Sequence, residues 1–279
     1  MSNEEQVDYW NGPGGERWAV MADRLDRMLA PFAEAVASRA AIVPGERVLD
    51  IGCGAGALTL KAAAAAGETG GALGVDISGP LLGVARQRAA AANLTATFEQ
   101  ADASQWRAPQ PVNAVVSRFG VMFFDAPAPA FANIRASAAP GARMTFICWQ
   151  PLRLNDWVTV PLKVALPFLK EPPVPGDPSA PGPFAFQDKD RVAGILSEAG
   201  WTGIAIEPFE TRVAMPGDDL AMSAQFMMKV GPHARLLAEQ EVDAAPVEAA
   251  LAEELAAHQD ADGAVSLAAA CWMVTAENA

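Results

Sequence analysis

The chain has 279 residues, of which 51% are hydrophobic, and it carries 20 basic against 33 acidic side chains, a formal net charge of −13. This length suffices for one sizeable α/β core with an added cap, and an acidic chain without a Lys/Arg cluster is a poor partner for nucleic acid or an anionic membrane. Three widely spaced cysteines fit reduced thiols, and two histidines without a Cys-x-x-Cys or His-Glu-x-x-His motif argue against a metal site.

Residues 1–42 are predicted to form an amino-terminal arm and helices over a ligand cleft. The stretch 8–18 contains the only tyrosine, two tryptophans and several turn-forming residues. It is either an arm over the cleft, with Trp10 and Trp18 as apolar walls and Arg17 as an anchor for an anionic group, or a segment packed on the sheet edge. Apolar residues at every third or fourth position over 19–41 predict amphipathic helix, with a break at Pro31.

The amino terminus is acidic and lacks the basic and apolar blocks of a signal peptide. No apolar run approaches the ~18 residues that a membrane-spanning helix needs. We therefore expect a cytoplasmic protein without membrane insertion.

The most informative stretch is VLDIGCGAG at residues 48–56, an apolar run that ends in an acid, passes three alternate glycines and enters a helix-forming segment. This pattern is typical of the first strand, turn and helix of a doubly wound α/β sheet. Gly52 permits the sharp turn, Gly54 lets backbone N–H groups approach a ligand, and Gly56 allows close packing of helix on strand. A carboxylate at Asp50 would repel a phosphate and attract an ammonium group.

Two further strands end in acids. The run 72–75 leads to Asp76, which is well placed to accept hydrogen bonds from ribose hydroxyls, and the run 96–100 leads to Asp102, a candidate acceptor for an exocyclic amine. The ligand implied by these residues contains an amino acid, a ribose and a purine, but no phosphate.

Residues 112–117 predict the fourth strand, and the loop that follows it should face the reacting part of the ligand. Phe119, Met122 and Phe123 are expected to line an apolar substrate pocket, whereas Phe124 is expected to pack beneath the next helix. Arg118 either recognises a substrate carboxylate or is an exposed charge, and the second interpretation is preferred. Arg88, on the second helix of the sheet, is expected on a solvated face.

Residues 48–56, 74–78, 101–103 and 114–120 together resemble the class I S-adenosylmethionine-dependent methyltransferases, in particular the small-molecule branch similar to the enzymes of ubiquinone and menaquinone biosynthesis. The resemblance implies a Rossmann-like α/β fold: a doubly wound, mostly parallel seven-stranded sheet with an antiparallel last strand and a helical cap. One departure is Asn113, because that family usually has an acid where the fourth strand opens.

The resemblance also implies the ligands and their contacts. The cofactor would be S-adenosyl-L-methionine, with S-adenosyl-L-homocysteine as product, and its methyl group would pass by in-line displacement to a small, partly apolar organic acceptor. The cofactor-binding residues would be Asp50, Gly52, Cys53, Gly54, Gly56, Asp76, Ile77, Asp102, Ala103 and Ser117. The substrate-binding residues would be Trp10, Trp18, Phe119, Met122 and Phe123.

The chain is therefore divided into the arm, a cofactor-binding core at 43–150, a proline-rich loop or lid at 151–187, and the rest of the sheet at 188–279, with a helical cap inserted at about 217–260. The last strand is predicted at 264–275. A catalytic base is optional for this chemistry; His233 in the cap is a weak candidate, and a satisfied surface histidine is the preferred interpretation.

Two other functions stay open at this stage. One is an NAD(P)-dependent oxidoreductase, which also uses a glycine turn and a downstream acid. The other is a protein that binds S-adenosylmethionine without turnover. The residues also leave open whether the acceptor atom is O, N or C, and whether the chain assembles as a homodimer.

Overall fold

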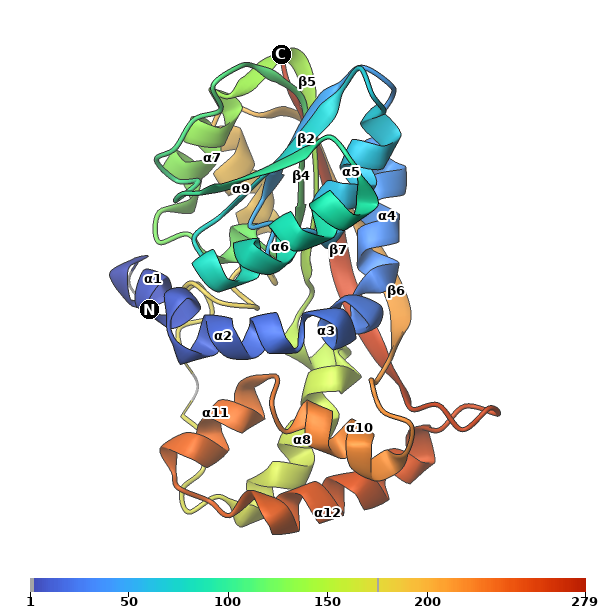
Figure 1. The fold of residues 1–279 in the computed structure, drawn as a ribbon. Coiled ribbons are helices and arrows are strands. Elements are labelled where there is room, and N and C mark those ends of the chain that lie inside the picture. Colours follow the sequence, from blue (N-terminus) through green and yellow to red (C-terminus); the bar gives the residue numbers. More distant parts are fainter. Residues whose placement is uncertain (1–2, 175) are drawn as a thin grey trace.

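The computed structural model describes residues 3–174 and 176–279, which form one seven-stranded sheet covered by helices (Figure 1). The strand order is β3-β2-β1-β4-β5-β7-β6; β7 runs antiparallel to both of its neighbours, and the other pairs are parallel. The strands are β1 Arg47–Ile51, β2 Gly71–Asp76, β3 Ala96–Gln100, β4 Val112–Arg118, β5 Ala138–Trp149, β6 Thr202–Ala214 and β7 Ser266–Asn278. The predicted doubly wound α/β fold is confirmed.

The order of the strands reverses between β1 and β4, which pair in parallel with Val48 opposite Ala114 and Asp50 opposite Val116. Both strands are buried along most of their length, so each contains consecutive apolar residues, Val48 and Leu49 in β1 and 114–116 in β4, rather than a strict alternation. In such sheets ligands bind beyond the carboxyl ends of the strands at this point of reversal. The topology therefore fixes where a ligand site should lie.

Helices cover both faces of the sheet (Figure 1). Helix α4, Ala30–Ala40, packs on β4 and β5 and beside α5, Ala57–Ala66, which packs on β1 and β2. Helix α6, Gly79–Ala92, packs on β3. On the other face α7, Pro127–Arg135, contacts α9, Lys189–Glu198, which packs on β6.

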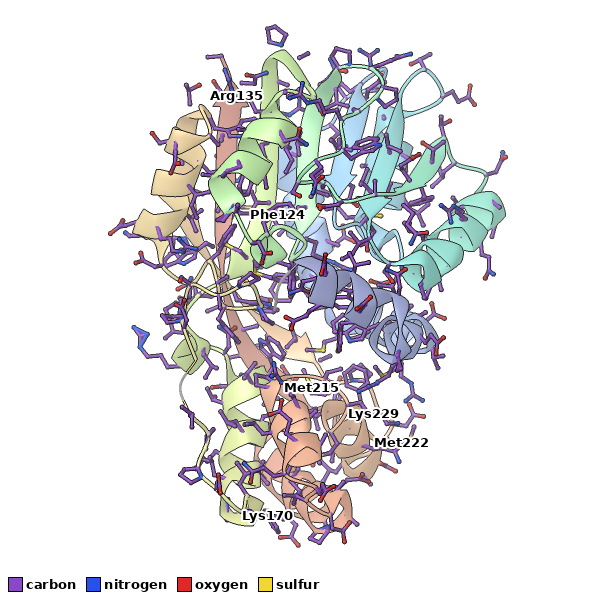
Figure 2. All side chains as sticks on the ribbon, turned by 90° about the vertical axis from the view of Figure 1, so that its left-hand side faces the viewer. Phe124, Arg135, Lys170, Met215, Met222 and Lys229 are labelled. Carbon is purple, nitrogen blue, oxygen red and sulfur yellow. The ribbon has the colours of Figure 1, made fainter. Side chains whose placement is uncertain are left out.

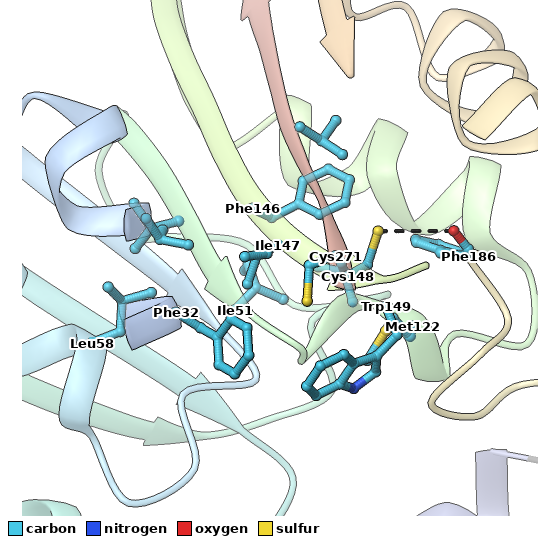
Figure 3. Close-up of a cluster of buried hydrophobic side chains, with 14 of the residues drawn as sticks. Phe32, Ile51, Leu58, Met122, Phe146, Ile147, Cys148, Trp149, Phe186 and Cys271 are labelled. Atoms are coloured by element: carbon cyan, nitrogen blue, oxygen red, sulfur yellow. Dashed lines mark hydrogen bonds between the residues drawn. The ribbon is translucent and has the colours of Figure 1, made fainter. Parts of the chain in front are cut away.

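The core lies between the sheet and these helices and is rich in aromatic rings (Figure 3). Phe131, Phe146 and Phe186 are fully buried, with ring centroids 5.7 to 6.5 Å apart. The three cysteines are free and buried, and the Cys148 thiol points at the Phe186 carbonyl. Burial raises the pKa of the Cys148 and Cys271 thiols, which keeps both as neutral apolar groups at physiological pH.

The amino-terminal segment crosses the carboxyl edge of the sheet as three short helices, α1 Asn3–Asn11, α2 Pro13–Val20 and α3 Ala22–Met28 (Figure 1). The turn-forming residues of 8–18 do not make an irregular arm, because Pro13 sits in the first turn of α2, where a missing N–H costs nothing. The helix does not break at Pro31, as the sequence predicted, but at two other positions. The helices separate at Met21 and Leu29, and Pro31 lies in the first turn of α4.

A second layer of helices forms a cap below the sheet (Figure 1). Three of its helices lie between β6 and β7, as predicted: α10 Leu220–Met227, α11 Pro232–Glu239 and α12 Ala244–Leu255. The fourth, α8 Asp156–Ala165, packs against α11 and α12 and lies in the segment predicted as a proline-rich loop. That prediction was wrong for residues 156–165, because Pro161 is accommodated inside a helix with the strongly amphipathic sequence DWVTVPLKVA.

Short 3-10 turns complete the fold at Val121–Phe123, Leu152–Leu154, Leu166–Phe168 and Ala256–His258. Among the described residues, no helix combines the length and apolar character needed to cross a bilayer. Nor does this part of the chain contain a group of three or more His, Cys, Asp or Glu side chains placed to hold a metal ion.

The fold predicts that Gly52 tolerates no side chain. Its φ is +64°, and a β-carbon there would lie 2.5 Å from the Gly120 Cα. We expect Gly52→Ala to lower the free energy of unfolding by about 2–4 kcal/mol, because left-handed strain and overlap with backbone add. Urea unfolding measures this change. Gly83→Ala in α6, where nothing lies within 4 Å, should instead stabilise by about 0.5–1 kcal/mol; equal effects of the two substitutions would contradict the packing described.

Candidate functional site

A cavity of about 770 Å³ lies at the carboxyl edge of the sheet, between the strand ends, the amino-terminal helices and the cap. This volume is in the range of pockets that hold small molecules. One end of the cavity is formed by the turns after β1, β2 and β3, and the other by aromatic residues after β4 and β5 and by the segment joining α10 to α11.

The first turn forms one wall of the cavity through Gly52, Cys53 and Gly54. A β-carbon on Gly54 would touch only the tip of Leu81 at 4.0 Å, so this backbone faces open space. The Gly54 N–H donates to Asp76 Oδ2 at 2.7 Å, and the Ser78 N–H donates to Asp76 Oδ1 at 2.8 Å. Burial raises the pKa of the Asp76 carboxyl, and these backbone donors oppose the shift. Asp76 thus joins the turn after β1 to the turn after β2, and beyond the backbone donors of Gly54, Ile77 and Ser78 its carboxylate can still accept a hydrogen bond from a ligand hydroxyl.

Asp50 lies behind the first turn and is not part of the cavity wall. Its Oδ2 accepts a hydrogen bond from Thr59 Oγ1 at 2.6 Å, whereas its buried Oδ1 has no partner in the structure. Loss of hydration raises the pKa of this carboxyl to about 7, and the hydrogen bond from Thr59 opposes the rise. The direct contact between Asp50 and a ligand ammonium that the sequence suggested does not fit this placement.

Gly56 and Ser117 also lie outside the wall. A β-carbon on Gly56 would lie 3.0 to 3.1 Å from the Ala85 side chain and the Phe98 ring, so this glycine serves the close packing of the turn on α6 and β3. Ser117 Oγ donates to the Ile51 carbonyl at 2.7 Å and accepts from the Gly120 N–H at 3.2 Å. Both residues therefore stabilise the turns that form the wall, and neither lines the cavity.

Ile77, Asp102 and Ala103 line the cavity on the side of β2 and β3. Helix α1 is fastened to this side: the Asn11 side chain donates to the Ile77 carbonyl at 2.9 Å and accepts from the Gly79 N–H at 3.0 Å. These bonds hold the amino-terminal helices over the cavity rather than on a sheet edge.

Trp10 and Trp18 stand in the cavity wall, as the cleft interpretation of the arm predicted. Their ring centroids are 5.4 Å apart, and Trp10 also meets Phe123 edge to face at 6.2 Å. Met122 and Phe123 belong to the same wall. Phe124 touches the cavity but also contacts the Phe131 ring of α7 at 6.0 Å, which fits the packing role expected of it.

The far end of the cavity is aromatic. Phe119 stacks on Trp149 with centroids 4.1 Å apart and planes 6° apart, and Trp149 meets Trp157 of α8 at 4.7 Å. Phe119 has a φ of +64°, an unfavourable backbone conformation for a residue with a side chain, which the packing around it must maintain. Trp149 and Trp157 were missed from the sequence, although Trp149 could have been found because it ends an apolar strand at the carboxyl edge.

Charged groups in the wall are organised around Asp26 of α3. Its two oxygens accept from Arg118 Nη2 at 2.7 Å and from Arg88 Nη1 at 2.6 Å. Arg88 also donates to the Ala55 carbonyl at 2.9 Å and pairs with Asp23. The expectation of solvated charges was wrong for both arginines: the Arg118 side chain is only 13% exposed and that of Arg88 22%.

The cap contributes residues that the sequence did not single out, among them Lys229, Gly231, Arg235 and Glu239. Figure 2 shows Lys229 among the cap helices.

His233 is not in the wall of the cavity. It is buried, its Nε2 hydrogen-bonds the Met227 carbonyl at 2.9 Å, and burial lowers its pKa to about 4. The preferred interpretation of a surface histidine was therefore also wrong, and this placement argues against proton abstraction by His233.

Comparisons with known proteins agree with this geometry. Residues 48–141 match the family model described as a methyltransferase domain. An uncharacterized protein of Mycobacterium tuberculosis is 31% identical over 134 residues, which are 47% of this chain and 46% of that protein. A relative in Mycobacterium bovis matches equally. The matched segment thus spans about half the length of these relatives.

Solved structures share the fold. The YcgJ protein of Bacillus subtilis superimposes with a TM-score of 0.57 at 14% identity, over 89% of this chain and 98% of that one. The magnesium protoporphyrin IX methyltransferase of Synechocystis, solved with bound S-adenosylmethionine, gives a TM-score of 0.52 at 18% identity, over 75% and 89% of the two chains. Residues 48–141 thus match a methyltransferase domain, and the fold is shared with a methyltransferase that was solved with bound S-adenosylmethionine. The ubiquinone-like branch stays a prediction.

The buried carboxyl of Asp50 predicts a pH-dependent stability. Because its folded pKa is raised from 3.8 to about 7, its stabilising contribution is fully present below pH 3.8 and is lost as the pH rises through 7. We expect Asp50→Asn, which keeps the shape but carries no charge, to gain roughly 4 kcal/mol over the wild type between pH 4 and pH 8. Denaturant unfolding at several pH values measures this difference; a difference that stays constant across this range would contradict the assignment.

Proposed function

We propose that this protein transfers the methyl group of S-adenosyl-L-methionine to a small, partly apolar organic acceptor by in-line displacement. The observation that carries the proposal is that one cavity has both kinds of wall: the glycine turn and Asp76 form one end, and aromatic side chains form the other. The net charge of −13 supports a small molecule rather than a nucleic acid as acceptor. We also propose a cytoplasmic location, which the free cysteines support.

The residues at the first end fit the cofactor. The open backbone of Gly54 leaves room for the amino-acid part, and the remaining acceptor capacity of the Asp76 carboxylate suits a ribose hydroxyl. Ile77, Asp102 and Ala103 would surround the adenine. The bound cofactor supplies an activated methyl group on a sulfonium, so this chain needs no covalent nucleophile.

The protein's contribution is alignment and the exclusion of water. The rings of Trp10 and Trp18 cover the cavity from the amino-terminal helices, and Phe123 covers it from the turn after β4. Helices α8 and α11 and the segment that joins α10 to α11 close the cavity from the cap. Orienting two bound reactants in this way is worth effective molarities of ~10⁵ M and above. Phe119, Met122 and Trp149 would present an apolar surface to the acceptor.

The cofactor assignment predicts selective binding. We expect titration calorimetry to show that S-adenosylmethionine and S-adenosylhomocysteine bind and that NADH does not. Asp76→Ala should weaken S-adenosylhomocysteine binding about 10- to 100-fold, because hydrogen bonds to a charged acceptor are lost. Circular dichroism checks that the variant is folded. Binding of NADH in place of the sulfur nucleosides would favour an oxidoreductase instead.

Turnover is tested with a panel of quinols, phenols and amines. For an acceptor that this panel identifies, we expect Phe119→Leu to raise KM about 10-fold by removing an aromatic contact, while the Kd for S-adenosylhomocysteine changes less than about threefold. Steady-state kinetics and calorimetry measure the two constants separately. An unchanged KM would remove Phe119 from the acceptor site, and cofactor binding without turnover on any member of the panel would support a protein that binds the cofactor without using it.

A further inference from the structure

One guanidinium group in the cavity wall has a buried nitrogen without a hydrogen-bond partner. Arg118 Nη2 pairs with Asp26 Oδ1 at 2.7 Å, but Arg118 Nη1 is buried and has no partner in the structure. A buried donor without an acceptor is costly, and more so when it is charged. Because Arg118 lines the cavity, its free N–H groups are available to an acceptor that enters with a ligand.

The surroundings leave this position electropositive. The single carboxylate of Asp26 is shared between Arg118 and Arg88. Asp23, the other partner of Arg88, is 88% exposed, so water screens its charge. No further carboxylate forms an ion pair with Arg118 among the residues that the structure describes, although its charge acts on the buried Asp50 carboxyl behind the turn. An anionic ligand group would therefore supply the missing hydrogen-bond acceptor.

The position of Arg118 identifies which anionic group this is. Arg118 ends β4, and the turn that follows it touches the first turn, where Gly52 and Gly120 are in contact. Arg88, which shares Asp26 with Arg118, is bonded to the Ala55 carbonyl of that first turn. Under the proposed function, the amino-acid end of the cofactor lies at this turn.

We propose that Arg118 binds the carboxylate of the amino-acid end of the cofactor, and that Asp26 is a positioning residue that holds the guanidinium in place. This inference rests on the proposed function. A guanidinium already fixed by one carboxylate loses little freedom when it binds a second, and its planar fork matches carboxylate geometry. Asp26 lies on α3, so carboxylate recognition is coupled to the closed position of the amino-terminal helices.

Arg17 is the rival anchor. It also lines the cavity, but it is exposed on α2 and makes no ion pair among the described residues. A flexible, hydrated side chain must lose more freedom to bind an anion than Arg118 must. Arg17 therefore provides a matched control for removing a positive charge from the same cavity.

The test compares two ligands that differ only in the carboxylate: S-adenosylhomocysteine and its decarboxylated analogue, the adenosyl thioether of 3-aminopropanethiol. Calorimetry on the wild type should show that loss of the carboxylate weakens binding about 10- to 100-fold. In Arg118→Gln this ratio should fall to within about threefold of unity, and Arg118→Lys should give an intermediate value. Arg17→Gln should keep the wild-type ratio.

The outcomes separate this inference from the proposed function. If Arg118→Gln is folded and keeps the wild-type ratio, or if the ratio collapses in Arg17→Gln instead, the assignment of Arg118 is overturned while the cofactor stands. If the wild type binds S-adenosylhomocysteine and the analogue equally, no residue of the chain recognises the carboxylate and the inference is again overturned. If the wild type binds neither ligand, the proposed function itself is overturned.

Discussion

The site depends on one close contact between backbones. The turn after β1 and the turn after β4 meet at Gly52 and Gly120, where a β-carbon on either residue would lie under 3 Å from the other's backbone. Ser117 reinforces the contact through the Ile51 carbonyl. Because these turns touch, the residues that follow β4 are fixed beside the glycine turn. The contact thereby places both the Arg118 guanidinium, whose Nη1 has no partner, and the strained backbone of Phe119 in the cavity wall.

Three separate parts of the chain enclose the cavity, and each is held in place by a different kind of interaction. The amino-terminal helices are fastened by hydrogen bonds of Asn11 and by the ion pairs of Asp26. The cap is continuous with the long strands β6 and β7, and Met215, at the end of β6, lies where the sheet passes into the cap (Figure 2). The aromatic stack from Phe119 to Trp157 joins the sheet to α8. Polar contacts therefore hold the cover of the glycine-turn end of the cavity, and apolar contacts hold its aromatic end.

The sequence predicted best those features that are encoded locally. The glycine turn and Asp76 follow from spacing along a single stretch, and the structure places them where that spacing implies. The missed features depend on distant segments. Helix α8 was not predicted, because a proline such as Pro161 usually breaks a helix. Trp157 and Lys229 line the cavity only because the cap packs against the sheet. For Asp50 the strand was predicted correctly, but not the direction of its side chain.

Asp50 still matters for ligand choice, although by another route than direct contact. Burial behind the turn is the main cause of its raised pKa; the charge of Arg118 opposes the rise, and the charge of Asp76 adds to it. With a pKa of about 7, Asp50 is partly ionised at neutral pH, and its charge opposes the partial positive charge at the start of α5. A diphosphate would gain little from that helix end, whereas an amino-acid group can place its carboxylate at Arg118 and its ammonium on the acidic side. Under the proposed function, selectivity against a diphosphate would then come from charges on both sides of the turn, with the Asp50 carboxyl behind it and the Arg118 guanidinium beside it, rather than from Asp50 alone.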